Sequence, residues 1–208
     1  MSSFLDFALI AVIVFIIIVI FFTILLFLFR KSSPKNLANY DVETLWKALN
    51  NQLIKLHETG RYKEATQVAE EALKTAKTLY GPNHIQVATS MNNLAAIYKG
   101  QGKFIEAEPL YKDALRIWTD ACGKESNEVA SCLNNLADLY TSLTKYLEAE
   151  ELYNQSLKIF EKIFGKFHPN IATVLENKAN LYRKTGNTAK AVIFEEQARL
   201  IRQQSKES

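Results

Sequence analysis

The sequence has few of the residues that build disulfide frameworks, metal centres or redox sites. It holds two cysteines, Cys122 and Cys132, which do not form a CxxC pair and which we expect to pack between helices. Its three histidines, His57, His84 and His168, are far apart along the chain. G-x-S-x-G, phosphate-loop and HExxH motifs are all absent. We therefore predict that the protein is not an enzyme and that it uses no cofactor and no metal.

Helix-breaking residues are also few, and the net charge is small. Seven glycines and four prolines among 208 residues favour helix throughout. The formal net charge is only +3, and three of the 25 basic residues (Arg30, Lys31 and Lys35) and one of the 22 acidic residues (Asp6) precede residue 36. The rest of the chain therefore carries 22 basic and 21 acidic side chains. Because such a balanced body has no clustered basic face, we expect no nucleic-acid partner.

One long apolar run stands out from this composition. Residues 7–29, FALIAVIVFIIIVIFFTILLFLF, contain no charged side chain and one polar side chain, Thr23. A helix of this length spans about 35 Å, which exceeds a hydrocarbon core of about 30 Å. No basic residue precedes the run and no small-x-small site follows it, so a cleaved signal peptide is disfavoured. The run is predicted to be a transmembrane helix.

The residues that flank the apolar run predict its orientation. Residues 1–6 carry only the charge of Asp6, whereas Arg30, Lys31 and Lys35 follow the run. The positive-inside rule then places residues 1–6 outside the cytoplasm and the remaining chain inside it. Residues 30–41 are expected to form a basic juxtamembrane linker that reaches at most about 40 Å. We therefore predict a single-pass membrane protein whose cytoplasmic domain works near the membrane surface.

Beyond residue 41 the sequence repeats itself with a period of 42 residues. The segment NNLAAIY, which begins at Asn92, recurs as NNLADLY from Asn134. Apolar residues spaced by three and four positions predict two helices in this unit, over about residues 85–99 and 104–122. The period predicts a repeat domain over residues 42–204, with units at about 45–86, 87–128, 129–170 and 171–204, and a polar tail over 205–208.

Glycines recur in register with this period. Gly102 stands between the two helices of its unit, where a positive φ angle turns the chain. Thr144 occupies the same position in the third unit, and we expect strain in that turn. The glycines expected at the turn within a unit are Gly60, Gly102 and Gly186, and those expected to close the second helices are Gly81, Gly123 and Gly165.

The pattern NNLA-x-x-Y…G-(K/R)-(F/Y)-x-EA…LY resembles the tetratricopeptide repeat. The 42-residue period, with Gly-x-x-His at residues 81–84 and 165–168, is similar to the variety found in kinesin light chains. The resemblance implies an all-α protein, a right-handed α-solenoid of about four helix pairs that follows one transmembrane helix. It gives His84 and His168 one structural role at the entry to a first helix. It implies protein–protein interaction without naming the partner.

Asparagines recur in register on the first helices, off the apolar stripe. In proteins of this family the first helices line a concave groove, and an amide can both donate to and accept from a peptide backbone. The alternative is that these asparagines are solvated surface or hold the repeats together. The groove lacks the dense basic set needed to bind a chain-terminal carboxylate. The candidate groove residues are Lys47, Asn50, Asn51, Thr89, Asn92, Asn93, Lys99, Ser131, Asn134, Asn135, Asp138, Asn177, Asn180 and Arg183.

These features together predict a membrane-anchored adaptor whose repeat groove binds a peptide segment of a partner protein. Two alternatives stay open on the sequence. One is a structural scaffold that self-associates into a homo-oligomer. The other is an accessory subunit of a membrane enzyme or of a secretion complex.

Overall fold

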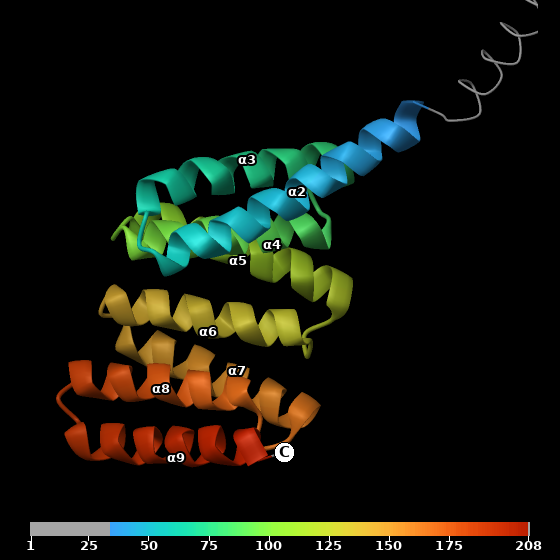
Figure 1. The fold of residues 1–208 in the computed structure, drawn as a ribbon. Helices are drawn as coiled ribbons and strands as arrows, with labels where there is room; N and C mark the ends of the chain where they lie inside the picture. The colour runs from blue at the N-terminus through green and yellow to red at the C-terminus, as the bar shows by residue number, and fades with distance from the viewer. Residues whose placement is uncertain (1–33, 208) are drawn as a thin grey trace, which may run out of the picture. The chain divides into compact units, whose positions relative to one another are not determined.

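The computed structural model describes residues 34–207, and the side chains of residues 42–205. This part of the chain is all-α and contains no strand. Within this part of the chain, residues 46–207 form one compact unit. The helices are α2 (Pro34–Glu58), α3 (Tyr62–Tyr80), α4 (Ile85–Gly100), α5 (Phe104–Cys122), α6 (Asn127–Ser142), α7 (Tyr146–Phe164), α8 (Pro169–Lys184) and α9 (Thr188–Glu207) (Figure 1).

The predicted transmembrane helix over residues 7–29 and the N-terminal residues 1–6 lie outside the described residues. Among the helices of residues 34–207, none is long and apolar enough to cross a bilayer. Helix α2 begins at Pro34, so residues 34–41, which the sequence suggested as linker, are helical. Proline suits the first position of a helix because its missing N–H has no partner to bond there.

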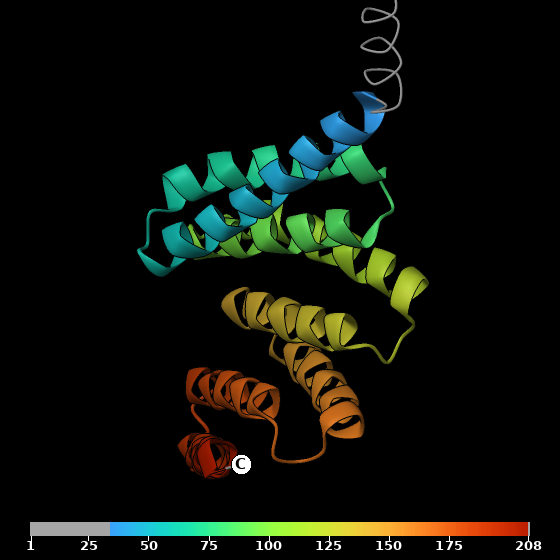
Figure 2. The ribbon, with the colours of Figure 1, turned by 45° about the vertical axis from the view of Figure 1, so that its right-hand side comes forward.

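The helices of the compact unit form antiparallel pairs that stack along the chain (Figures 1 and 2). Helix α4 pairs with α5, α6 with α7, and α8 with α9, and each second helix also packs on the first helix of the next pair. The first helices of successive pairs contact each other as well, α4 with α6 and α6 with α8. The surface formed by α2, α4, α6 and α8 is called the first-helix face below. The predicted solenoid of helix pairs is confirmed.

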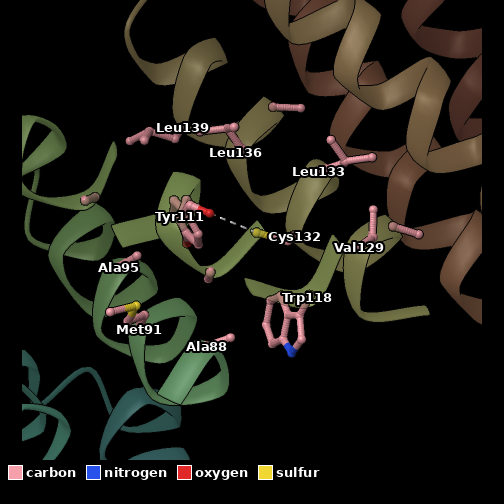
Figure 3. Packing of buried hydrophobic residues seen from close by; sticks show 14 of the residues in the cluster. Ala88, Met91, Ala95, Tyr111, Trp118, Val129, Cys132, Leu133, Leu136 and Leu139 are labelled. Atoms are coloured by element: carbon pink, nitrogen blue, oxygen red, sulfur yellow. Dashed lines mark hydrogen bonds between the residues drawn. The ribbon is translucent and has the colours of Figure 1, made fainter. Parts of the chain in front are cut away.

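The core between the pairs is closely packed around large aromatic side chains. Tyr111 of α5 is 1% exposed and lies between α4 and α6 (Figure 3). The thiol of Cys132 donates a hydrogen bond of 3.3 Å to the backbone carbonyl of Tyr111, and burial raises the pKa of Cys132 to about 12. Cys132 is therefore an inert packing residue, as predicted. For Cys122 the prediction was wrong, because this last residue of α5 is exposed.

The turns inside the pairs follow the predicted pattern. Gly102 has a φ angle of +74°, and Thr144 adopts +62° at the same position of the third pair. Among the described residues Thr144 is the only one other than glycine with a positive φ. A β-branched side chain is unfavourable in this region because its Cβ crowds the backbone. The positive φ angle at this turn is confirmed, and the strain expected from it stays a prediction.

The first helices also begin in a repeated way. The Nδ1 atom of His84 accepts a hydrogen bond of 3.2 Å from the backbone N–H of Gln86, and His168 accepts an equal bond from Asn170. Each imidazole stacks on the aromatic ring four residues before it, Tyr80 or Phe164, with centroids 4.6 Å and 4.0 Å away. The two histidines are N-caps, which is the shared structural role predicted for them.

Candidate binding face on the first helices

The fourteen candidate residues all lie on first helices. Lys47, Asn50 and Asn51 are on α2, and the others are on α4, α6 and α8. Their side chains differ in exposure, since Asn134 is 7% exposed whereas Asn51 and Asn180 are exposed. The face is therefore built from residues with different structural roles.

The asparagines of successive repeats bond to one another. The Nδ2 atom of Asn93 donates to Oδ1 of Asn50 at 3.0 Å. Asn135 donates in the same way to Asn92 at 3.1 Å, and Asn177 to Asn134 at 3.0 Å. Each bond joins the residue at the first asparagine position of one repeat to the residue at the second position of the next repeat. We call these three bonds the asparagine ladder, and they show that the row holds the repeats together.

The ladder leaves one polar atom uncommitted in most of its amides. Asn93 and Asn135 use only Nδ2, and Asn92 uses only Oδ1, in hydrogen bonds to other described residues. Asn50 is different because its Nδ2 donates a second bond of 2.8 Å to the backbone carbonyl of Trp46. A ligand could thus bond to the remaining amide atoms without breaking the ladder. The scaffold role and the binding role are compatible.

Three of the four charged candidates form ion pairs. The ammonium group of Lys99 on α4 forms an ion pair with the carboxylate of Asp138 on α6. The guanidinium of Arg183 pairs with Glu195 of α9, so it is turned toward the last helix. These pairs neutralise much of the charge on the first-helix face. The candidate residues therefore present mainly amides and hydroxyls to a ligand.

Two hydroxyl candidates have different surroundings. The Thr89 hydroxyl donates to the backbone carbonyl of Ile85 at 3.1 Å, within its own helix. Ser131 lines a polar cavity of about 170 Å³ between α6 and α8. Asn134, Asn135, Asn170 and Thr173 line the same cavity. The structure thus brings three of the predicted residues into one concave polar site.

A second cavity opens between α2 and α4 and is mainly apolar. Its volume is about 260 Å³, and Leu53, Ile54, Ala96 and Ile97 form most of its wall. Of the predicted residues only Asn93 lines it. The sequence prediction missed this cavity because it followed the polar row. The signal was present at Ile54, an apolar residue on the polar side of α2 that is 55% exposed.

Tyrosines of the first helices bond to glutamates of the preceding second helix. The Tyr140 hydroxyl donates to Glu108 at 3.0 Å, and the Tyr98 hydroxyl donates to Glu70 at 2.9 Å. Tyr182 bonds to Glu150 in the way Tyr140 bonds to Glu108, 42 residues further along. These bonds hold each first helix against the second helix of the preceding repeat.

The carboxyl of Glu108 is surrounded by donors. The ammonium group of Lys112 contributes most to lowering its pKa, and the Tyr140 hydroxyl and Lys145 lower it further, while burial opposes them. Glu108 therefore stays ionised well into the acidic range and keeps the bond to Tyr140. Within the described residues there is no cluster of three side chains that could hold a metal ion.

A family model described as tetratricopeptide repeat matches residues 48–120, 87–162 and 128–204. The solved structure of BtubC (BKLC) from P. vanneervenii is similar, with a TM-score of 0.66 and 29% identity over 79% of this chain. This chain spans 66% of the length of BtubC.

A second solved structure confirms the fold alone. It is a protein described as a putative kinesin light chain with nearly identical TPR-like repeats, from Podosopora anserina. It has a TM-score of 0.55 and 22% identity, and the match covers 86% of this chain and 93% of that one. No curated protein sequence matches this one.

Proposed function

Since this chain belongs to the tetratricopeptide repeat family, a family of protein-interaction modules, we propose that its first-helix face binds a peptide segment of a partner protein. The observation that carries the proposal is the asparagine ladder, whose three bonds hold amide groups in register along four successive repeats. Amides fixed in this way bond to a peptide backbone with little loss of conformational freedom. The binding surface is therefore pre-organised by the same bonds that join the repeats.

The proposal includes a membrane anchor. The uncharged residues 7–29 support it, since a helix of that length can span a bilayer, and the basic residues after them favour a cytoplasmic location for the repeats. An anchored domain meets membrane-bound partners at a raised local concentration. Protease treatment of sealed, right-side-out vesicles tests this topology. Protection of the repeats is expected, and their digestion would contradict it.

The binding test uses residues that carry no ladder bond. Asn51 and Asn180 are exposed on the first-helix face, so their replacement by alanine should leave the fold intact. Capture of partner proteins from a detergent extract by the full chain, followed by mass spectrometry, gives the readout. The double variant Asn51→Ala/Asn180→Ala should lose captured partners that the wild type retains.

A matched control separates the face from the rest of the surface. Gln67 of α3 and Gln197 of α9 are exposed amides on second helices. The double variant Gln67→Ala/Gln197→Ala should capture the wild-type set. Equal capture by both variants and the wild type would place binding elsewhere. Light scattering of the same preparations tests the competing scaffold function, for which a mass that rises with concentration is required.

A further inference from the structure

At one equivalent position of the first helices, the residue type changes from apolar to polar along the stack. Ile54, Ala96, Asp138 and Asn180 follow each other at intervals of 42 residues, on α2, α4, α6 and α8. The first two are apolar and the last two are polar. The same position therefore divides the first-helix face into an apolar half at α2–α4 and a polar half at α6–α8.

The apolar half contains a cavity that fits a side chain. Ile54 and Ala96 line the 260 Å³ cavity together with Leu53 and Ile97. Leu53 is 4% and Ile97 is 1% exposed, so the cavity has a firm, buried floor, while Ile54 forms an accessible wall at 55% exposure. A ligand side chain that covers the apolar surface of such a site stabilises the complex. The volume of the cavity is sufficient for one bulky aliphatic or aromatic side chain.

The rim of this cavity carries a negative charge. Glu58, the last residue of α2, lines the cavity beside His57. Glu58 is exposed, and it forms no ion pair with another residue of the described part of the chain. A basic group next to the apolar side chain would complement this carboxylate.

The polar half contains the smaller cavity of about 170 Å³. Ser131, Asn135 and Thr173 offer it hydroxyl and amide groups, and a ligand group of the same kind can bond to them. Two repeat steps separate the cavities, each of about 10 Å by ordinary helix packing. An extended chain advances about 3.3 Å per residue, so about six residues span the roughly 20 Å between them.

From these observations we infer that the partner segment is an extended peptide with a bulky apolar residue next to a basic one, and with serine, threonine or asparagine about six positions away from them. The apolar side chain enters the α2–α4 cavity, and the small polar one lies in the α6–α8 cavity. The inference rests on the proposed function, because it specifies the ligand of the same face. It adds a residue pattern by which partners are selected.

Random decapeptides displayed on phage, selected on the full chain in nanodiscs, test the pattern. Selected peptides should be enriched in Leu, Ile, Phe or Trp beside Lys or Arg, with the small polar residue at the stated spacing. A selected peptide should bind the Ile54→Asp variant about ten- to a hundred-fold more weakly, because the apolar anchor then meets a carboxylate. Ala96→Leu should weaken binding too, because it fills the cavity without adding charge.

Ile105→Asp is the matched control. Ile105 is 85% exposed on α5, away from both cavities, so this variant should bind the selected peptide like the wild type. Bound peptides without an apolar anchor, or equal loss in Ile54→Asp and Ile105→Asp, would overturn the inference and leave peptide binding in place. If the wild type selects no peptide at all, both the inference and the proposed function are overturned.

Discussion

The indole N–H of Trp46 donates a hydrogen bond of 2.9 Å to the hydroxyl oxygen of Ser90, across the boundary between the first two repeats. Both residues are buried, and the Ser90 hydroxyl in turn donates a hydrogen bond of 3.0 Å to the backbone carbonyl of Gln86. The bond fastens α2 onto α4, where the apolar cavity lies. A buried donor that loses its acceptor destabilises the folded state, because its desolvation is no longer offset by a hydrogen bond.

Ser90→Ala should therefore lower the free energy of unfolding by about 1–3 kcal/mol, because the Trp46 N–H is left without an acceptor. Chemical denaturation measures the cost. In the Trp46→Phe background the same substitution should cost less, since no buried donor is stranded there. Hydrogen exchange should speed up in α2 more than in α8, because a solenoid loses protection locally. Equal costs in the two backgrounds would refute the role of the bond.

Thr144→Gly should raise the free energy of unfolding by about 1 kcal/mol. Glycine adopts the φ angle of +62° without the crowding of a β-branched side chain, although it gains freedom in the unfolded chain. Thermal unfolding measures the change. The reciprocal substitution Gly102→Thr, at the equivalent turn with a φ angle of +74°, should be destabilising. A loss of stability in Thr144→Gly would show that the turn carries no strain.

The asparagine ladder predicts an asymmetry between two identical substitutions. Asn93→Asp sets a carboxylate against Oδ1 of Asn50, and Asn50 cannot turn its amide around because its Nδ2 is bonded to the Trp46 carbonyl. A cost of about 1–3 kcal/mol is expected from two facing acceptors. Asn135→Asp should cost less, since Asn92 can rotate and donate to the new carboxylate. Denaturation of the two variants at neutral pH compares them, and equal costs would mean that Asn50 is not held.

Lys178 stands where the second and third repeats have Leu94 and Leu136, and it is only 7% exposed. Its ammonium group bonds to Asn154 at 2.6 Å and lies over the Phe194 ring. Burial lowers the pKa of Lys178, and Lys190 lowers it further, while Glu150 opposes them. Lys178→Leu should therefore stabilise the last repeat by about 1–2 kcal/mol at neutral pH, because it restores the apolar contact of the other repeats.

The sign of the pH dependence provides a further check on Lys178. Because the pKa is lower in the folded state, the unfolded chain binds more protons in the window below the ordinary lysine value of about 10.4. The stability of the wild type should rise with pH in that window, and the advantage of Lys178→Leu should shrink there. Urea unfolding at pH 7 and near pH 10 measures this. An advantage that grows toward pH 10 would contradict the burial cost.

The helical framework follows closely from the sequence. The second helix of the second unit was expected at about residues 104–122, and α5 spans Phe104–Cys122. This agreement has a physical cause, because the apolar spacing marks the buried stripe and the glycines mark where the chain must turn. Helix α2 begins earlier than expected, at Pro34, since polar residues without an apolar stripe give no periodic signal for helix.

The partners of the polar side chains could not be predicted in the same way. The sequence puts Asn92 and Asn134 in register at 42 residues, but the ladder bonds join residues 43 apart. The one-residue offset arises from how neighbouring first helices lie against each other, which no single helix pattern encodes. The apolar cavity was missed for a similar reason, because Ile54 forms a cavity wall only together with Ala96 of the next repeat.

The last repeat ends the asparagine ladder with a different residue, and this affects where the array could gain further repeats. In the last repeat Glu176 takes the place of the first asparagine, and Arg202 of α9 holds its carboxylate with bonds of 3.0 Å and 2.8 Å. A helix pair fused after α9 would have to displace that guanidinium before it could join the row. A duplicated α4–α5 pair inserted inside the stack would instead receive both an acceptor and a donor. The array is therefore suited to growth by internal duplication, with its terminal pair kept unchanged.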